Sequence, residues 1–499
     1  MQKRDVDVVR GPLPSDYQET AIAHLVDGVW LEQASGDRHT LLNPANGEAI
    51  GSFYGSGAVE VTAAAEAAGR SLHRWSRMPA PERGAILARA ADLMRDRAVA
   101  IALDLTVEQG KPLPQARGEV LGSAAVLDWF AELARRSYGR TVPALDGVTL
   151  QTVTPRPVGA VAVLTPWNSP LGTSVRTVAA ALAAGCTVVL KPASETPRSA
   201  LGFARALVDA GVPQGVFNCI LGRAGPISAQ LIDHPAIRKI SFTGSVAVGR
   251  QLARRAGERL KPLVLELGGH APVVIFDDVD VTLVAKEACA AKFDNAGQIC
   301  IAPSRFYVHR KAYRDFLDAM ATEVDSIRIG EGWVEGVGMG PLANSRRVDE
   351  IDRLAKDALS SGGKLIRGGN RLGNRGCFYA PTLIGDVSEG SAVMQEEPFG
   401  PLAAVLPFDT EDEVISRSNA LPFGLAGYVF SRDMVRLDRV GAQLEVGMAG
   451  LNNFAISKPE LPFTGIKDSG YGYSCGEEGF ESFVIRHTVT RRHAHSDCH

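Results

Sequence analysis

GAVAVLTPWNSP (residues 159–170) opens the part of the sequence that decides the fold. From here to residue 269, short runs rich in β-branched residues alternate with longer segments whose apolar spacing is helical. Parallel strands need crossover connections of this length, and the usual crossover is a helix. The alternation therefore predicts a parallel sheet covered by helices, with strands in GAVAVLTPW (159–167), CTVVLKP (186–192), VFNCILG (216–222), IRKISFTGS (237–245) and LKPLVLELGG (260–269).

Glycine and proline mark where the predicted helices end. The segment VRTVAAALAAG stops at Gly185, and SALGFARALVDAG stops at Gly211 with Pro213 just beyond it. Repeated units of this kind are typical of an α/β, doubly wound sheet of the Rossmann type. Such sheets bind nucleotides at the carboxyl ends of their strands, so we expect the functional residues there.

Two further regions lie on either side of this unit. A second alternation begins at APVVIFDD (271–278) and predicts a second α/β domain. Before residue 130, VTAAAEAAGRSLHRWSRM and ERGAILARAADLMRDRAVAIALDL have the spacing of amphipathic helices that coat the first sheet. The segment DGVTLQTVTPRPVG carries Pro155 and Pro157, which suits an edge strand or a protruding hairpin that extends towards another subunit.

The composition is that of a folded protein without general affinity for polyanions. The chain of 499 residues is 45% apolar and 22% charged, and its formal net charge is −3. This charge gives no broad attraction to nucleic acid or anionic lipid. No run reaches the roughly 18–20 apolar residues of a membrane span, and the N-terminus lacks the apolar stretch of a secretory signal. We expect a cytoplasmic protein that binds neither nucleic acid nor membranes.

The seven cysteines are an odd number and are scattered without a CxxC pair. This spacing argues against a disulfide framework and against a structural zinc site, so we expect free thiols. The C-terminal tail carries His493, His495, Cys498 and His499, but chain ends are usually poorly ordered. We expect no metal site.

Three residues have types and positions that suit covalent catalysis. Cys300 follows Asn295 and Gly297 in KFDNAGQIC, where backbone amides can activate an accessible thiol; the alternative is an inert buried thiol. Glu266 ends an apolar strand, where burial raises the pKa of a carboxyl towards that of a general base, unless nearby amides bind it. Asn168 in TPWNSP follows another strand and either donates to an oxyanion or forms a turn.

The stretch FTGSVAVG (242–249) joins a predicted strand to a predicted helix through Gly244. Backbone amides at such a helix N-terminus suit a pyrophosphate. The stretch is not the GxGxxG fingerprint, and turn geometry or close helix packing explains Gly244 and Gly249 equally well. By itself it leaves dinucleotide binding open.

Together these motifs resemble those of the aldehyde dehydrogenase superfamily, in the same order from about residue 25 to 490. The resemblance implies that Cys300 attacks the aldehyde carbonyl, that Asn168 and the Cys300 backbone amide hold the oxyanion, and that Glu266 activates the water that hydrolyses the thioester. The substrate would be a small aldehyde, the product a carboxylic acid, and the hydride acceptor NADP or NAD. The stretches that carry the resemblance are TPWNSP, KPASETP, FTGSVAVG, LELGGHAP, NAGQIC, EEPFGP and PFTGIKDSGYG.

The resemblance also implies where the cofactor binds. Lys191 would contact the adenosine ribose, Ser245 the pyrophosphate, and Glu397 with Phe399 the nicotinamide ribose. The complete set of implied cofactor contacts is Thr165, Pro166, Trp167, Lys191, Ser194, Glu195, Gly225, Phe242, Gly244, Ser245, Leu267, Glu397 and Phe399.

The architecture of the family implies three domains and a homo-oligomer. We expect a homodimer or a homotetramer, held together by a small β domain. The implied units are a dinucleotide-binding domain (1–129 and 158–266), an α/β catalytic domain (267–468) and oligomerisation elements (130–157 and 469–499).

One departure from the family pattern bears on the cofactor. Many NAD-preferring members have a glutamate that binds the ribose hydroxyls, in the pattern KPxE, where this chain has Ser194; Glu195 follows one position later. A serine removes the charge that would repel a 2′-phosphate, and Lys191 would attract that phosphate. We therefore predict a preference for NADP, with NAD as the alternative.

A second departure bears on the substrate. The chain is most similar by eye to the succinate-semialdehyde dehydrogenases, in which two arginines and a serine hold the carboxylate of the substrate. Arg176 and Ser457 match two of these positions, and Phe463 is expected to contact the substrate as well, but the other arginine is Asp294 here. A like charge disfavours an anion, which would favour neutral, hydroxylated, aromatic or cationic aldehydes. Alternatively, Asp294 pairs with Arg176 or points away.

Two other functions are compatible with the same fold. A CoA-acylating semialdehyde dehydrogenase shares the thioester, but it has no need of a base such as Glu266 that activates water. A non-catalytic dinucleotide-binding protein has no need of Cys300, Glu266 and Asn168 together.

Overall fold

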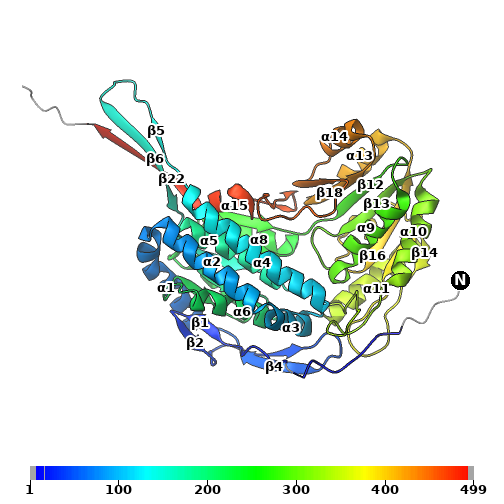
Figure 1. Cartoon of the computed structure of the whole chain (residues 1–499), viewed down its shortest axis with the longest axis horizontal. Helices are drawn as coiled ribbons and strands as arrows, with labels where there is room; N and C mark the ends of the chain where they lie inside the picture. The colour runs from blue at the N-terminus through cyan, green and yellow to red at the C-terminus, as the bar shows by residue number, and fades with distance from the viewer. Residues whose placement is uncertain (1–6, 16, 493–499) are drawn as a thin grey trace, which may run out of the picture.

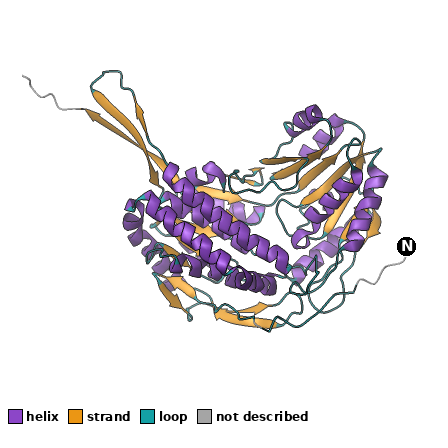
Figure 2. Cartoon of the chain, in the orientation of Figure 1, coloured by secondary structure: helices purple, strands orange, loops and turns teal. Residues whose placement is uncertain are grey.

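The computed structural model describes residues 7–15 and 17–492 of the chain. Two α/β bodies lie side by side, and a ribbon of strands projects from one of them (Figure 1). Figure 2 shows that helices cover the sheets of both bodies, whereas the ribbon consists of strands alone. The α/β class with a doubly wound first sheet is therefore confirmed.

The first sheet has eight strands in the order β2-β1-β9-β8-β7-β10-β11-β21. Its centre, from β9 to β11, is parallel, as the crossover spacing predicts. At one edge β1 pairs antiparallel with β9 and β2 pairs antiparallel with β1, and at the other edge β21 pairs antiparallel with β11. The strands are β1 (His24–Val26), β2 (Val29–Leu31), β7 (Ala160–Leu164), β8 (Thr187–Lys191), β9 (Phe217–Cys219), β10 (Ile237–Thr243), β11 (Leu263–Glu266) and β21 (Gly470–Tyr471).

Alternating side chains give this sheet two buried faces. Val161 and Val163 of β7 lie in a core that helices α2 to α6 complete, whereas Ala160 and Ala162 lie in a core with α1, α7 and α8. α5 ends at Gly185, whose φ of 91° is the left-handed conformation expected of a glycine cap. The helices are α1 (Ala58–Arg77), α2 (Ala80–Asp96), α3 (Ala98–Gln109), α4 (Leu113–Leu133), the short η1 (Ala134–Arg136), α5 (Pro170–Ala184), α6 (Pro197–Asp209), α7 (Ala224–Asp233) and α8 (Val246–Glu258).

The second sheet has seven strands in the order β14-β15-β16-β13-β12-β18-β19. Only β14 is antiparallel to its neighbour, so this is the second α/β unit that the alternation after residue 271 predicts. Its strands are β12 (Ala271–Ile275), β13 (Pro303–His309), β14 (Lys364–Arg367), β15 (Thr382–Gly385), β16 (Leu402–Phe408), β18 (Ala426–Phe430) and β19 (Met448–Leu451). The helices that follow along the chain are α9 (Val281–Phe293), η2 (Asp294–Gly297), α10 (Tyr313–Ser326), α11 (Ser345–Ser360), α12 (Ala392–Gln395), α13 (Glu411–Asn419), α14 (Met434–Gly441) and α15 (Gly476–Glu481).

The projecting ribbon contains the proline-bearing segment. β6 (Thr149–Pro157) protrudes as predicted, but it is the middle strand of three, in the order β22-β6-β5, and not an edge strand. β5 (Arg140–Val142) reaches only residues 151–153 of β6, whereas β22 (Val484–Arg492) pairs with its whole length. Pro155 and Pro157 therefore lie where β6 has one open side, which is the position a sheet tolerates for proline.

Two small ladders complete the described structure: β3 (Arg38–Leu42) pairs with β4 (Ala49–Tyr54), and β17 (Phe423–Gly424) pairs with β20 (Ile466–Lys467).

Several expectations concern features that the described residues lack. Residues 7–15 and 17–492 contain no helix that is both long and apolar enough to cross a bilayer. The same residues contain no cluster of His, Cys, Asp and Glu that could hold a metal ion, and their six cysteines are free. The C-terminal histidines and Cys498 that were considered for metal binding lie outside the described residues.

Candidate active site

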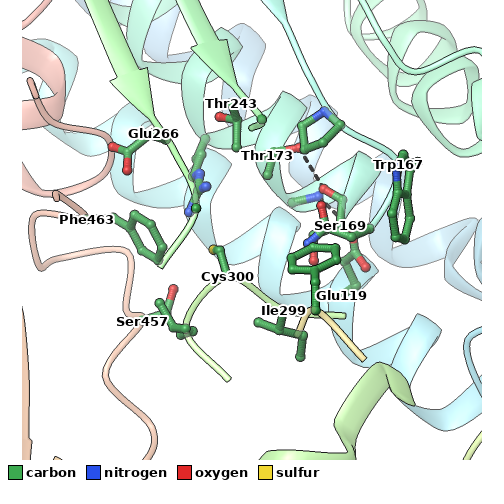
Figure 3. A pocket seen from close by; sticks show the side chains of 18 of the residues that line it. Glu119, Trp167, Ser169, Thr173, Thr243, Glu266, Ile299, Cys300, Ser457 and Phe463 are labelled. Carbon is green, nitrogen blue, oxygen red and sulfur yellow. Dashed lines mark hydrogen bonds between the residues drawn. The ribbon is translucent and has the colours of Figure 1, made fainter. Parts of the chain in front are cut away.

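Asn168, Glu266 and Cys300 come from three segments and line one cavity of about 870 Å³. Asn168 lies between β7 and α5, Glu266 is the last residue of β11, and Cys300 follows η2. β7 and β11 are both neighbours of β10 in the parallel sheet, so their carboxyl ends open at the same edge. Figure 3 shows Glu266 and Phe463 on one side of the Cys300 thiol and Trp167 on the other. The structure thus brings together the three residues that the sequence selects for catalysis.

The loop before Cys300 has an unusual backbone. Asn295, Ala296 and Gly297 follow one another with φ values of 49°, 53° and 73°. A residue with a side chain adopts this left-handed conformation at a cost of ~1–2 kcal/mol, so the surrounding structure must hold it. At Gly297 a Cβ atom would lie 2.2 Å from the carbonyl oxygen of Gly400, so that only glycine fits. The backbone that aims Cys300 therefore depends on tertiary contacts.

Buried amide side chains provide those contacts. Asn295 Nδ2 donates to the Asn168 carbonyl at 3.0 Å, and Asn295 Oδ1 accepts from Gln109 Nε2 at 2.9 Å. Gln298 Nε2 donates to the Asn295 carbonyl, and Gln298 Oε1 accepts from the Ala343 N–H, both at 3.0 Å. Sequence reasoning missed Gln109 and Gln298. For Gln109 the available signal was its place at the end of α3, a helix in which every residue of the second half is buried.

Asn168 has a donor left for an anion. Its side-chain Nδ2 donates to the Gln298 carbonyl at 3.0 Å, and the residue is 6% exposed at the cavity wall. A primary amide nitrogen carries two hydrogens, so one N–H has no protein acceptor among the described residues. A preorganised donor of this kind stabilises an oxyanion in a cavity that excludes most water.

Glu266 is buried in the manner of a general base. It is 3% exposed, its Oε1 accepts from the Ser474 hydroxyl at 2.8 Å, and its Oε2 has no hydrogen-bond partner among the described residues. Burial raises the pKa of Glu266 to about 7, against smaller lowering effects of Arg176 and of the Ser474 hydrogen bond. The carboxyl is therefore poised to take a proton near neutral pH.

The environment of Cys300 differs from the activated thiol that its sequence neighbours suggest. Cys300 is half-buried, and burial raises its pKa to about 12. Arg176 and the Cys300 backbone amide lower that pKa, whereas Glu397 and Glu266 raise it. Because the sequence does not reveal two carboxyls near the thiol, it could not indicate this balance. A base must take the proton of Cys300 as the thiol attacks, and Glu266 lines the same cavity.

Two cations and a serine line the same cavity. Arg176, Ser457, Lys458 and Phe463 all contribute to its wall. The Arg176 guanidinium stacks on the Phe463 ring, 4.1 Å from the centroid, and its Nε is buried without an acceptor. Neither Arg176 nor Lys458 forms a salt bridge with a carboxylate among the residues that the structure describes. Lys458 was not among the residues selected from the sequence.

The structure does not bring Asp294 into the lining of this cavity. Asp294 is half-buried at the end of α9, where burial raises its pKa and Lys111, the salt-bridge partner of Glu119, lowers it. It forms no salt bridge with Arg176.

The cofactor residues implied by the sequence divide into three groups. Lys191, Thr165, Phe242 and Gly225 lie outside the cavity lining, and Ser194 with Glu195 lines a second cavity of about 700 Å³. The remaining ones share the wall that holds Cys300: Pro166, Trp167, Gly244, Ser245, Leu267, Glu397 and Phe399.

The residues of this wall fit an extended dinucleotide. Ser245 caps α8, accepting from the Val248 N–H at 3.4 Å, and the first turn of the helix leaves amides for a pyrophosphate. At Gly249 a Cβ would lie 2.6 Å from the Leu267 side chain, so glycine lets α8 approach the strand. The Trp167 and Phe399 rings meet edge to face at 5.5 Å and leave a flat apolar surface beside the thiol.

Both basic and acidic groups lie near Ser194. Burial lowers the pKa of Lys191 to about 8, whereas Glu195 raises it. The Ser194 hydroxyl donates to the Gly222 carbonyl at 2.8 Å. The pKa of His39 is lowered by burial and by Lys191, with a further small lowering by Arg223, so three basic groups are close enough to influence one another here.

Comparison with known proteins gives the class that this fold and site define. The sequence pattern of the aldehyde dehydrogenase family matches residues 30–489. The chain is 42% identical to the succinate-semialdehyde dehydrogenase [NADP(+)] of Escherichia coli (92% of this chain, 95% of the relative). It is also 42% identical to a glutarate-semialdehyde dehydrogenase of Pseudomonas aeruginosa, with the same coverage. The crystal structure of an NAD-dependent aldehyde dehydrogenase from Sinorhizobium meliloti superposes with a TM-score of 0.95 at 31% identity, over 97% of each chain.

The chain belongs to the aldehyde dehydrogenase family. It is an NAD(P)-dependent aldehyde dehydrogenase, which oxidises an aldehyde to a carboxylic acid with NAD or NADP as the hydride acceptor.

Gly297→Ala is expected to displace the nucleophile. The added methyl meets the Gly400 carbonyl, and φ of 73° strains an alanine, which together cost on the order of 2–4 kcal/mol. We expect a melting temperature lower by several degrees and a changed rate of Cys300 alkylation, measured by calorimetry and peptide mass mapping. Gly118→Ala, in open space on α4, is the control and should match the wild type. Equal stability and alkylation in both variants would contradict the role given to the loop.

Proposed function

We propose that the enzyme oxidises an aldehyde with a distal anionic group, that Cys300, Glu266 and Asn168 carry the chemistry, and that NADP is its preferred cofactor. The observation that supports this best is one cavity whose wall holds a thiol, a raised-pKa carboxyl and an amide donor together with Arg176, whose guanidinium has no salt-bridge partner among the described residues. The names of the relatives agree with this substrate class, since succinate and glutarate semialdehydes each carry a carboxylate.

The catalytic residues act in two stages. As Glu266 takes the thiol proton, Cys300 Sγ bonds to the carbonyl carbon, and the oxygen becomes an anion that the Asn168 amide and the Cys300 backbone N–H stabilise. NADP or NAD, held against the wall of Trp167, Glu397 and Phe399, would supply the acceptor for the hydride, and the acyl group would then remain on Cys300 as a thioester. Glu266 passes its first proton to solvent and then takes a proton from water as the water oxygen bonds to the acyl carbon; the C–S bond breaks, the acid is released, and the Cys300 thiolate takes the proton back from Glu266.

Arg176 supports recognition of the distal anion. A buried guanidinium without a carboxylate partner is costly unless a ligand supplies the charge, and its donor fork suits a carboxylate. The Ser457 hydroxyl and the exposed Lys458 ammonium line the same cavity. Because Asp294 is absent from that lining, we build on the alternative in which it points away from the substrate.

Ser194 and Lys191 support the preference for NADP. Ser194 is neutral, and Lys191 is the nearby basic group that suits a 2′-phosphate, since Arg223 is paired with Asp37 and burial lowers the pKa of His39. Glu195 is the opposing charge at this site.

The projecting ribbon supports a homodimer or homotetramer. Several large apolar side chains on or near its strands are exposed, which is unusual unless another subunit covers them: Tyr138, Leu145, Val148, Leu150 and Ile485.

Cys300→Ala should abolish NAD(P)H formation with any aldehyde, whereas Glu266→Gln should still form about one NAD(P)H per site, more slowly because Glu266 takes the thiol proton, and then turn over ~10²–10⁴-fold more slowly. The measurement is rapid-mixing NAD(P)H absorbance with an aldehyde panel. Addition of CoA should not restore the Glu266→Gln rate. Activity in Cys300→Ala, or acyl-CoA as the main product of the wild type, would overturn the proposed chemistry.

Arg176→Gln should lower selectivity for anionic aldehydes. A charged hydrogen bond contributes ~1.5–3 kcal/mol, so the ratio of kcat/KM for succinate semialdehyde to that for butanal should fall ~10-fold or more. Lys458→Gln should lower the ratio less, because the ammonium is exposed. Arg176→Lys keeps the charge and serves as the control. If the wild type prefers butanal, the substrate class is wrong.

Ser194→Glu should change the cofactor preference. A carboxylate at this position repels the 2′-phosphate, so we expect KM for NADP to rise at least ~10-fold while KM for NAD changes little. Ser194→Gln, of equal size and neutral, should leave the preference for NADP largely intact. Equal kinetics of the wild type with NADP and NAD would contradict the proposed preference.

A further inference from the structure

The C-terminal segment delivers one side chain to the general base. β21 pairs with the end of β11, with Gly470 opposite Glu266, and the chain then turns back past the same strand. Ser474, 4% exposed, lies in this returning segment. Its hydroxyl donates to Glu266 Oε1 at 2.8 Å, and no other described residue hydrogen-bonds that carboxyl. A residue more than 200 positions away in the sequence is therefore the only one to fix the carboxyl in place.

The backbone of Ser474 is itself held in place. Its N–H donates to the Phe463 carbonyl at 3.0 Å, and its carbonyl accepts from the Phe463 N–H at 2.6 Å, which forms an antiparallel bridge. Phe463 in turn stacks on Arg176 at 4.1 Å. The segment that orients Glu266 thus also supports the Arg176 guanidinium.

The two oxygens of Glu266 are not equivalent. Oε1 is occupied by Ser474, whereas Oε2 is buried without a partner, which is unfavourable for an acceptor in a folded protein. A serine donor on one oxygen leaves the other as the unoccupied acceptor of the carboxyl.

We propose that Ser474 is a positioning residue for Glu266: its hydroxyl fixes Oε1 so that Oε2 receives the proton during hydrolysis of the thioester. This inference rests on the proposed function, because it assigns Glu266 the role of base. Ser474 touches neither substrate nor cofactor in this scheme and acts only through the carboxyl.

The groups around Glu266 give the expected pH dependence. Arg176 from α5, Ser474 and Cys475 from the C-terminal segment and Cys300 from the nucleophile loop all face it. Burial raises the pKa of Glu266 to about 7, and Ser474 lowers it because it donates to the charged form. Loss of the hydroxyl should raise the pKa further. A base works only when deprotonated, so the acidic limb of the pH–rate profile should move to higher pH.

The test compares Ser474→Ala with Ser474→Thr, which keeps the hydroxyl. For Ser474→Ala we expect the acidic limb of kcat to move up by about one pH unit and steady-state turnover at pH 7 to fall ~10-fold, while the NAD(P)H burst before hydrolysis keeps its amplitude. Ser474→Thr should restore the wild-type profile. Ser482→Ala removes a half-buried hydroxyl of the same segment that donates to the Tyr473 and Glu478 carbonyls and not to Glu266, so it is the control for the loss of a serine hydroxyl near Ser474. An unshifted limb in folded Ser474→Ala overturns the inference.

A second comparison keeps the inference testable if Ser474→Ala folds poorly. Ser474→Cys is of similar size to the wild type, and its thiol is a weaker donor than the hydroxyl. The acidic limb of kcat in this variant should therefore lie at a pH between those of the wild type and Ser474→Ala. In the Glu266→Gln background, either change should have no further effect on turnover, because the base is already absent. An additional loss there would assign Ser474 another role. If the wild type itself forms no NAD(P)H with any aldehyde, the proposed function fails. If the wild type turns over normally and the acidic limb of Ser474→Ala is unshifted, only the role proposed for Ser474 fails.

Discussion

The hydrogen bonds of the Asn295 side chain are the constraint on which the site depends. They join a loop of the second α/β body to the Asn168 carbonyl and to Gln109, both of which belong to the first body. The loop they hold has three consecutive residues with positive φ, a conformation that an isolated peptide would abandon. Cys300, Asn168 and the shared cavity wall are therefore held in register because buried amide side chains cross the boundary between the two α/β bodies.

Burial, more than any single ion pair, sets the electrostatics of the cavity. It raises the pKa of Glu266 and Glu397 to about 7 and that of Cys300 to about 12, and it lowers that of Lys191 to about 8. Each group is thereby moved towards its neutral form: the two carboxyls exchange protons near neutral pH, whereas the thiol keeps its proton until a base takes it. Arg176 is the one charge that lowers the pKa of both the base and the thiol, so an anion bound to it would also change their proton affinity.

Two departures from the family pattern, together with Lys458, change the charges around this common framework. Ser194 removes a carboxylate from the ribose site, and Asp294 removes an arginine from the substrate pattern without itself lining the cavity. Lys458, on the same loop as Ser457, brings a cation to the cavity wall from another direction. The fold tolerates such exchanges because they lie at the ends of strands and in loops, outside the packed cores.

The sequence alone determined the alternating strands and helices, the glycine stop at Gly185 and the selection of Cys300, Glu266 and Asn168, because periodicity and local motifs act over a few residues. The tertiary structure decided that β6 is a middle strand, that Asp294 is absent from the cavity lining, and that Gln109, Lys458 and Ser474 reach the site. It also decided the raised pKa of the Cys300 thiol. These features depend on contacts between residues far apart in the chain and on burial, neither of which local sequence encodes.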